Sequence, residues 1–272
     1  MAELNRKVVF AYPNQTKAIT LTGSRCDLKC SHCGGHYLQG MKPVTAIAAE
    51  KQRGARSFLV SGGCLADGRV PFGDSLELLA ELKQDVRYNL HVGLIADDEI
   101  EKVAALADTV SFDFVGDDRT IQEVLHLNRT VADYVACYES LKQHCSVIPH
   151  ICIGLYGGEI RGEYRALEEL QRLGADKITF IVFTPTKGTA FADKNPPALT
   201  EVEKIFAAAR RLFPHIPLQL GCMRPGGAYR RELDCMAIQM GLNGIVNPAK
   251  DAVKLAEELG LQPERREECC VL

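Results

Sequence analysis

Short apolar runs alternate with amphipathic stretches along almost the whole chain. The runs are rich in β-branched and aromatic residues, which is typical of strands. The stretches between them repeat their apolar residues at the helical period. The predicted strands are residues 18–22, 57–61, 90–95, 109–115, 150–155, 177–183, 216–220 and 242–246. The predicted helices are residues 44–52, 73–86, 98–107, 131–144, 159–173, 200–213, 228–240 and 248–260.

Eight strand–helix units in succession predict an α/β fold with a parallel sheet covered by helices. The count favours a closed (β/α)8 barrel of the TIM type over an open doubly wound sheet. In such barrels the active site lies at the carboxyl ends of the strands. The 272 residues fit one barrel domain with a core at about residues 18–248. A short N-terminal extension and a C-terminal helix with a cysteine-rich tail would flank it.

Composition narrows the class of protein. Hydrophobic residues make up 46% of the chain and the net charge is −3. A nucleic-acid-binding protein would be basic, so nucleic acid is not expected as a partner. No apolar run approaches the roughly 20 residues that span a bilayer, so no membrane association is expected. The odd count of 11 cysteines, without a secretory leader, predicts a reducing, cytoplasmic location.

Three cysteines, Cys26, Cys30 and Cys33, follow the first predicted strand with the spacing C-x3-C-x2-C. Four cysteines normally close a cubane iron–sulfur cluster, so three leave one iron without a protein ligand. An open coordination position distinguishes catalytic metal sites from structural ones. The spacing therefore predicts a [4Fe–4S] cluster whose fourth iron binds another molecule.

Zinc and disulfide interpretations of this loop are weaker. Cys30 and Cys33 could form a C-x2-C knuckle, but a zinc site needs a second pair of ligands at a suitable distance. His32 and His36 lie in the same short loop and supply no such pair. An odd number of cysteines in a cytoplasmic chain also argues against a disulfide framework.

The cysteine triplet resembles the cluster motif of the radical S-adenosylmethionine (SAM) superfamily, and the resemblance extends over about residues 18–248. In that superfamily SAM binds the open iron of the cluster. An aromatic residue usually precedes the last cysteine and packs beside the adenine. His32 stands at that place here, so the resemblance implies the same role for it.

A second match lies after the second predicted strand. Ser61, Gly62 and Gly63 resemble the family's Gly-Gly-Glu segment, whose backbone contacts the methionine amino group, although Cys64 replaces the acid. Glycine suits that role because it lets the backbone approach a ligand closely. Alone, the segment would also fit an ordinary strand-to-helix turn.

Further residues resemble family positions at later strand ends. Gly154 and Gly157 match part of the family's G-x-I-x-G-x-x-G run. Asp113 is a candidate for the ribose hydroxyls, because a carboxylate can accept both hydrogen bonds. Pro185 lies in a stretch that resembles the P-x-x-G-T-P-L stretch of biotin synthase. Arg224 falls where biotin synthase carries its barrel arginine, which implies a catalytic residue lining the lumen; a surface salt bridge is the alternative.

The surplus of cysteines suits a second, auxiliary iron–sulfur cluster, as in sulfur-inserting members of the biotin synthase branch. The first predicted ligand set is Cys64, Cys222 and Cys235, and the second is the tail pair Cys269 and Cys270. The loop at residues 33–41 and the cysteine-rich ends resemble the second component of the split, two-protein lipoyl synthases.

The resemblance implies that SAM cleavage at the cluster gives a 5′-deoxyadenosyl radical, which abstracts hydrogen from an aliphatic carbon. Sulfur insertion into a small-molecule or octanoyl-protein substrate would follow. A second radical SAM partner protein and a low-potential electron donor are the implied partners, and the lumen is expected to be mainly apolar and cysteine-lined. Three alternatives stay open: rearrangement or maturase chemistry without sulfur insertion, a non-catalytic iron–sulfur electron carrier or assembly partner, and a zinc-containing barrel enzyme.

Overall fold

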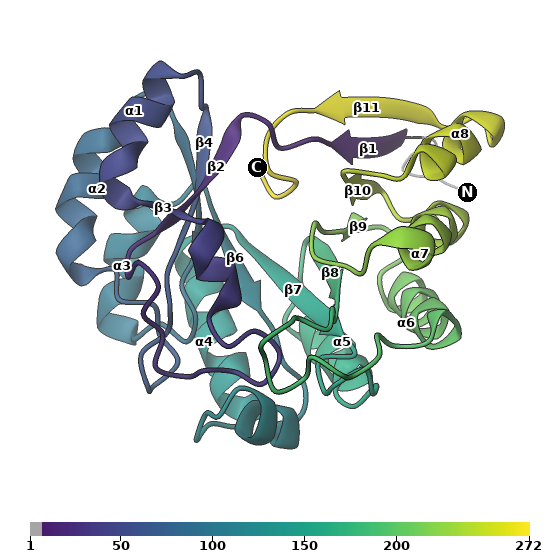
Figure 1. The fold of residues 1–272 in the computed structure, drawn as a ribbon, viewed down its shortest axis with the longest axis horizontal. Coiled ribbons are helices and arrows are strands. Elements are labelled where there is room, and N and C mark those ends of the chain that lie inside the picture. Colours follow the sequence, from purple (N-terminus) through teal and green to yellow (C-terminus); the bar gives the residue numbers. More distant parts are fainter. Residues whose placement is uncertain (1–6) are drawn as a thin grey trace.

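The strands form one curled, parallel sheet with the α-helices arranged around its outside (Figure 1). The computed structural model describes residues 7–272. Within this part of the chain the sheet has 11 strands in the order β11-β1-β10-β9-β8-β7-β6-β5-β4-β2-β3. They are β1 (Lys7–Ala11), β2 (Thr16–Thr20), β3 (Lys42–Pro43), β4 (Ser57–Ser61), β5 (Arg87–His91), β6 (Thr109–Asp113), β7 (Val147–Ile153), β8 (Ile178–Val182), β9 (Leu218–Leu220), β10 (Gly244–Val246) and β11 (Gln262–Arg266).

One helix follows almost every strand, and the eight predicted helices are confirmed within a few residues at each end. They are α1 (Ile47–Gln52), α2 (Leu76–Leu82), α3 (Asp97–Leu106), α4 (Val131–His144), α5 (Glu163–Arg172), α6 (Leu199–Leu212), α7 (Gly227–Gln239) and α8 (Lys250–Glu258). Short helical turns supplement them: η2 (His36–Gly40), η3 (Val44–Ala46), η4 (Gly73–Ser75) and η5 (Thr120–Val124), of which η5 is a π-helix. A capping box between Thr130 and Asp133 begins α4, satisfying backbone N–H groups that the helix itself cannot pair.

The expected α/β architecture is confirmed, and all eight predicted strands are present. The hydrogen-bonded ladder nevertheless stays open between β3 and β11, rather than closing strand to strand. The C-terminal segment spans this opening: the backbone N–H of Gln15 donates to the Glu267 carbonyl at 2.9 Å. The backbone N–H of Cys269 donates to Thr16 Oγ1 at 2.7 Å. The C-terminal segment after β11 thus connects β11 to β2, although no strand pairing closes the sheet at this point.

The two faces of the strands differ in chemistry. Side chains that face the helices are apolar: Phe112 packs against Tyr134 and Tyr138 of α4, and Phe180 packs against Phe206 of α6. Since successive residues of a strand point to opposite faces, their neighbours point into the lumen. These inward residues include Asn89, His91, Ser111, Asp113, His150, Cys152, Thr179 and Gln219. The lumen is therefore largely polar, and the expectation of a mainly apolar lumen is wrong.

The helices of the described part of the chain lie on the sheet. None of those within residues 7–272 is both long enough and apolar enough to cross a membrane.

Candidate metal and cosubstrate site

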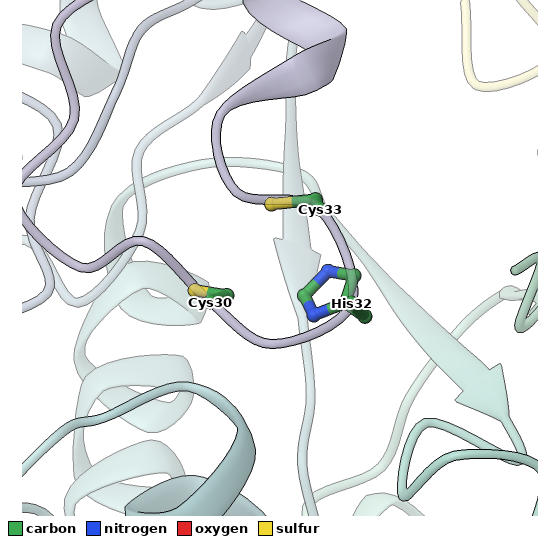
Figure 2. A group of neighbouring side chains, drawn as sticks. All are labelled: Cys30, His32 and Cys33. Carbon is green, nitrogen blue, oxygen red and sulfur yellow. The ribbon is translucent and has the colours of Figure 1, made fainter. Parts of the chain in front are cut away.

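The three-cysteine loop leaves the carboxyl end of β2, at the mouth of the curled sheet. The ligand atoms of Cys30, His32 and Cys33 all lie within 4.8 Å of one another (Figure 2). Cys30 is buried, whereas the other two side chains are partly exposed. Cys26, the remaining member of the triplet, is also partly buried and packs at the edge of the core. Cys30, His32 and Cys33 thus converge on a common point, whereas Cys26 lies outside this group.

The electrostatics of the loop suit a bound cation. A hydrogen bond from Cys30, followed by contact with His32, lowers the pKa of Cys33 to about 4. The same hydrogen bond and burial raise the pKa of Cys30. Cys33 is thus the more acidic thiol of the pair, and a cation bound beside both sulfurs would favour the ionised form of each. The buried Nδ1 of His32 has no hydrogen-bond partner among residues 7–272. This donor set fits an iron–sulfur cluster.

The last residue of η5 and the segment that follows it hold the cysteine loop in place. The Ser31 backbone N–H donates to the Val124 carbonyl at 2.8 Å. The two ring nitrogens of His126 lie 2.9 Å from the Leu28 carbonyl and 3.1 Å from the Ser31 hydroxyl. His126 adopts a φ of 58°, which is unusual for a side chain with a Cβ. These contacts clamp the residues on both sides of Cys30, and sequence reasoning did not identify His126.

The predicted Gly62–Gly63 segment packs on the cysteine loop. A Cβ on Gly63 would lie 1.9 Å from the Arg25 carbonyl oxygen and 2.6 Å from Cys26 Cα, so only glycine fits there. The Gly63 backbone N–H also donates to Thr22 Oγ1 at 2.7 Å. Ser61 ends β4 just before this contact. The close packing of Gly63 on the cysteine loop therefore explains why this position needs a glycine.

Cys64 lies beside the triplet. Its carbonyl accepts a hydrogen bond from the Asp27 backbone N–H at 2.8 Å. Burial, followed by the negative charges of Cys26, Asp113 and Cys33, raises the pKa of Cys64 to about 12. Cys64 is therefore a neutral thiol beside the cysteine loop.

A row of polar side chains crosses the lumen on four neighbouring strands. Asp113 pairs in register with His150, His150 with Thr179, and Thr179 with Gln219. Asp113 is exposed and has no hydrogen-bond or ion-pair partner within the described residues. Gln219 donates to Thr179 Oγ1 at 2.7 Å, so the lower end of the row is internally paired.

Two histidines meet on this wall. The rings of His91 and His150 have centroids 5.5 Å apart. Burial, followed by the neighbouring imidazole, lowers the pKa of His91 to about 4. Burial likewise lowers the pKa of His150, against the opposing effect of Asp113. Both imidazoles are therefore neutral near pH 7, and neither was singled out from the sequence.

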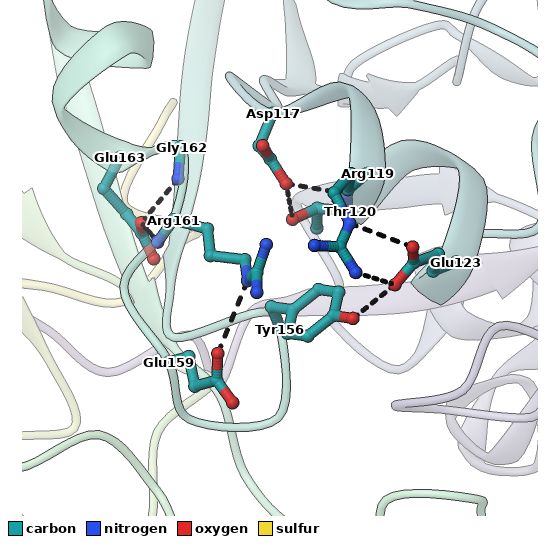
Figure 3. A network of polar contacts seen from close by, with 9 residues as sticks. All are labelled: Asp117, Arg119, Thr120, Glu123, Tyr156, Glu159, Arg161, Gly162 and Glu163. Carbon is teal, nitrogen blue, oxygen red and sulfur yellow. Dashed lines mark hydrogen bonds and ion pairs between the residues drawn. The ribbon is translucent and has the colours of Figure 1, made fainter.

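A small pocket opens at the carboxyl ends of β6 and β7. Its lining includes Asp117, Cys152, Tyr156 and Arg161. Figure 3 shows the polar network along one side, where Arg119 and Tyr156 both contact Glu123. The Arg161 guanidinium lies over the Tyr156 ring, 4.2 Å from its centroid. Contacts from η5 thus connect the pocket to the segment that clamps the cysteine loop.

The predicted Gly154 and Gly157 shape the loop beside this pocket. Both have positive φ, and a Cβ on Gly154 would meet the Pro197 ring at 2.9 Å. Glu163 organises the same loop. It accepts a hydrogen bond from the backbone N–H of Gly154 at 2.7 Å. It also accepts one from the backbone N–H of Arg161 at 2.8 Å (Figure 3). Burial raises the pKa of the Glu163 carboxyl, although these hydrogen bonds oppose the shift.

The loop after β8 reaches the cysteine loop across the mouth. It contains the predicted Pro185, which is partly buried. Its neighbour Thr186 lies 3.0 Å from the Tyr37 hydroxyl, oxygen to oxygen. The Phe191 backbone N–H donates to the Ser31 carbonyl at 3.0 Å. Tyr37 thus joins the two loops that border the mouth.

Arg224 does not present a free guanidinium to the lumen, contrary to expectation. Its side chain is fully buried against Asp234 of α7, with Nε 2.7 Å from Oδ1 and Nη2 2.9 Å from Oδ2. Nη1 and Nη2 also donate to the carbonyls of Gly221 and Val246. The surface-bridge alternative is wrong as well, because the ion pair is interior. Its observed contacts are those of a residue that ties the loops after β9 and β10 to α7.

The predicted auxiliary cysteines lie in different parts of the described chain. Among residues 7–272, Cys30, His32 and Cys33 form the only group of three ligating side chains within 4.8 Å. Cys235 lies on α7, where burial and then the charge of Asp251 raise its pKa. Neither the first set, Cys64, Cys222 and Cys235, nor Cys222 with the tail pair forms such a group.

The tail cysteines fold into the barrel. Lys177 Nζ donates to the Cys270 carbonyl at 2.6 Å, and Asn89 Nδ2 lies 3.7 Å from Cys269 Sγ. A hydrogen bond to Cys269 and burial raise the pKa of Cys270, and the charge of Cys222 raises it further. Cys222 is accessible to water, yet burial raises its pKa too, which fits a side chain on the lumen wall. Cys222 thus belongs with the tail pair.

No family model and no curated protein matches the sequence. Solved structures do match the fold. Methylornithine synthase (PylB) is 16% identical with a TM-score of 0.64, covering 96% of this chain and 84% of its own. The FeFe-hydrogenase maturase HydG from Carboxydothermus hydrogenoformans is 15% identical with a TM-score of 0.67, covering 95% and 68%. Streptococcus suis SuiB bound to S-adenosylmethionine is 14% identical with a TM-score of 0.57, covering 80% and 52%. These are radical SAM enzymes, and the likeness to them is one of fold.

Proposed function

We propose that this chain is a radical SAM enzyme. The observation that carries the proposal is the convergence of Cys30, His32 and Cys33 ligand atoms within 4.8 Å at the mouth of the curled sheet. Cys26 completes the triplet on the same loop. The fold that this chain shares with SAM-bound SuiB supports the same assignment.

Cys26, Cys30 and Cys33 would hold a [4Fe–4S] cluster, leaving one iron for SAM. When bound, the cluster and SAM supply a low-potential electron and a carbon-centred oxidant for an unactivated C–H bond. The chain's own residues hold and enclose them. His126 and Gly63 position the cysteine loop, and Tyr37 helps to border the mouth, which limits the access of water.

For SAM itself, the proposed contacts follow the resemblance. His32 would stack on the adenine, the backbone of residues 61–63 would face the methionine end, and Asp113 would accept the ribose hydroxyls. Gly154, Gly157 and Pro185 would shape the surrounding wall. The pocket under Tyr156 lies beside the strand end that carries Gly154, in keeping with a site for part of the cosubstrate.

A second, finer candidate is sulfur insertion in lipoyl (octanoyl) cofactor synthesis. The observation that favours it is the surplus of thiols around the lumen, with Cys222, Cys269 and Cys270 close enough to perturb one another's pKa. These three would be the ligands of an auxiliary cluster. An octanoyl-protein substrate, a second radical SAM protein and a low-potential electron donor would be its partners. Rearrangement or maturase chemistry without sulfur insertion remains its alternative.

The organisation proposed for the chain is one barrel domain over residues 1–272. All eleven cysteines are unpaired. We place the enzyme in the cytoplasm on that ground, because reducing compartments keep thiols free.

The test of the proposed function is anaerobic reconstitution followed by incubation with SAM and dithionite. We expect about four irons per chain for one cluster and formation of methionine and 5′-deoxyadenosine. The Cys26/Cys30/Cys33 triple alanine variant should form neither product. Protein that binds iron but yields no 5′-deoxyadenosine would be an electron carrier, and zinc in place of iron would favour the zinc enzyme.

The same variant tests the auxiliary cluster. Under the sulfur-insertion candidate it should retain about four irons per chain, and these should be lost when Cys222, Cys269 and Cys270 are also changed to serine. An iron-free triple alanine variant would remove that candidate while leaving the radical SAM assignment intact.

A further inference from the structure

Three histidines lie in or beside the cysteine loop, and they differ in how their ring nitrogens are used. His126 has both nitrogens in hydrogen-bond contact with the loop. His36 is exposed, and its ring packs edge-on against that of Tyr37. His32 has a buried nitrogen, Nδ1, without a hydrogen-bond partner in the described chain. A buried polar atom without a protein partner is costly, which indicates that it binds a ligand.

The unpaired imidazole lies beside two of the cluster thiols. The ligand atoms of Cys30, His32 and Cys33 are within 4.8 Å of one another (Figure 2). Cys26 lies outside this group, yet the proposed cluster needs it as the third thiolate. Cys64, the other thiol beside the loop, lies outside the group as well. The loop therefore offers a cubane cluster four ligating side chains rather than three, and the fourth is an imidazole.

An imidazole suits this place chemically. Histidine nitrogen is a common ligand of iron, and histidine replaces cysteine at iron–sulfur clusters of the Rieske type. Thiolate is the softer and negatively charged ligand, whereas imidazole binds as a neutral base. A neutral base leaves an iron with its own lone pair and needs no proton to do so. Of the four side chains, His32 is therefore the one that another molecule can most easily displace.

We infer that His32 binds the fourth iron of the cluster while SAM is absent and leaves it when SAM binds. The inference rests on the proposed radical SAM function. In the exchange the iron–imidazole bond breaks, and the amino nitrogen and a carboxylate oxygen of SAM bind the same iron. The ammonium group of SAM gives its proton to solvent, and no electron is transferred. The released ring can then stack on the adenine, which is the contact proposed for it above.

Capping has a measurable cost for the binding of SAM. The ring must leave the iron before SAM can occupy it, so the apparent affinity for SAM falls with the fraction of protein that is uncapped. Replacing His32 by phenylalanine removes the competing nitrogen and keeps a flat ring for the adenine. This change therefore separates ligation of the iron from stacking.

The first test detects the iron–nitrogen bond itself. Wild-type protein labelled with ¹⁵N-histidine is reconstituted anaerobically, reduced with dithionite and measured by pulsed EPR. Without SAM we expect a ¹⁵N nucleus coupled to the cluster, and saturating unlabelled SAM, frozen directly after mixing, should weaken this signal at least tenfold. The signal should be absent from His32→Phe. His36→Phe, at the exposed histidine of the same loop, is the matched control and should retain it.

The second test measures the dissociation constant of SAM by equilibrium dialysis. It uses the oxidised cluster, which lacks the electron needed to cleave SAM. We expect His32→Phe to bind SAM at least threefold more tightly than the wild type, because no ring competes for the iron, and His36→Phe to match the wild type. Both variants keep the three cysteines, so each should hold about four irons per chain.

Absence of ¹⁵N coupling in the wild type without SAM would overturn the inference, whatever the variants do. Coupling that survives saturating SAM or the His32→Phe change would do the same, as would equal affinity of the wild type and His32→Phe for SAM. The proposed function is scored separately by 5′-deoxyadenosine formation. Wild-type protein that cleaves SAM without a coupled ¹⁵N contradicts only the capping by His32, whereas a coupled ¹⁵N without cleavage contradicts only the proposed function.

Discussion

Gly63 lies directly against the backbone of Cys26, so that a Cβ at position 63 would stand 2.6 Å from Cys26 Cα. The loop after β4 and the cysteine loop are therefore in direct backbone contact. The Gly63 N–H to Thr22 Oγ1 hydrogen bond fixes the same contact. The position of the cluster ligands thus depends on a residue that is not itself a ligand.

Gly63→Ala should disturb the cysteine loop, because the nearest contacts are backbone atoms that cannot rotate away. We expect the reconstituted variant to hold less than half the iron and sulfide of the wild type. Gly226→Ala is the matched control: its φ is −88° and no heavy atom lies within 4 Å of the added carbon. Wild-type iron content in Gly63→Ala would show that the two loops can separate without loss of the site.

Arg224→Met should destabilise the fold, since it leaves Asp234 buried without its ion-pair partner. Removing one member of a buried pair costs about 3–5 kcal/mol. The free energy of unfolding of the apoprotein in urea measures this loss. Arg231→Met, which removes an exposed contact with Asp251 at 3.9 Å, should cost less than about 1 kcal/mol.

The double variant Arg224→Met/Asp234→Leu should recover much of that stability, because no unpaired charge remains in the interior. If Arg224→Met instead left stability unchanged and abolished SAM cleavage, the catalytic role expected from the sequence would be restored.

The outward face of the sheet was predictable, because the apolar residues of elements such as α4 and β6 recur at the helical and strand periods. The strands β1, β3 and β11 were missed. β11 is a fully exposed, charged and proline-containing edge strand that forms by pairing with β1. That pairing joins segments near the two ends of the sequence. The strand propensity of each segment taken alone does not predict it.

The candidate site, like the fold, was only partly predictable from the sequence. The spacing of Cys26, Cys30 and Cys33 is local, so the loop could be identified from the sequence. His91 and His150 are 59 positions apart and meet only through the curvature of the sheet. A strand that is buried on both faces also conceals which of its residues point inward. Arg224 was misassigned because its partner, Asp234, lies on the following helix.

Glu163→Gln should loosen the loop beside the pocket, because the carboxylate accepts backbone hydrogen bonds through both oxygens and an amide has only one acceptor oxygen. We expect a loss of about 1–3 kcal/mol in the free energy of unfolding, typical of buried backbone donors left unpaired. Hydrogen exchange of the Arg161 and Gly162 amides should accelerate. Glu159→Gln, at an exposed position in the same loop, is the control; equal behaviour of both variants would count against this role.

The stability of the apoprotein should fall as the pH drops from about 6.5 toward 5. The pKa of His91 is lowered to about 4 in the fold, so the unfolded chain binds a proton in this range while the native chain does not. Each pH unit then costs about 1.4 kcal/mol, or about 2 kcal/mol between pH 6.5 and 5, and His150 acts in the same direction. Urea unfolding at several pH values measures the slope. His91→Leu should flatten it and His215→Asn, at an exposed histidine, should not; an unchanged slope in His91→Leu would mean that His91 is charged in the native state.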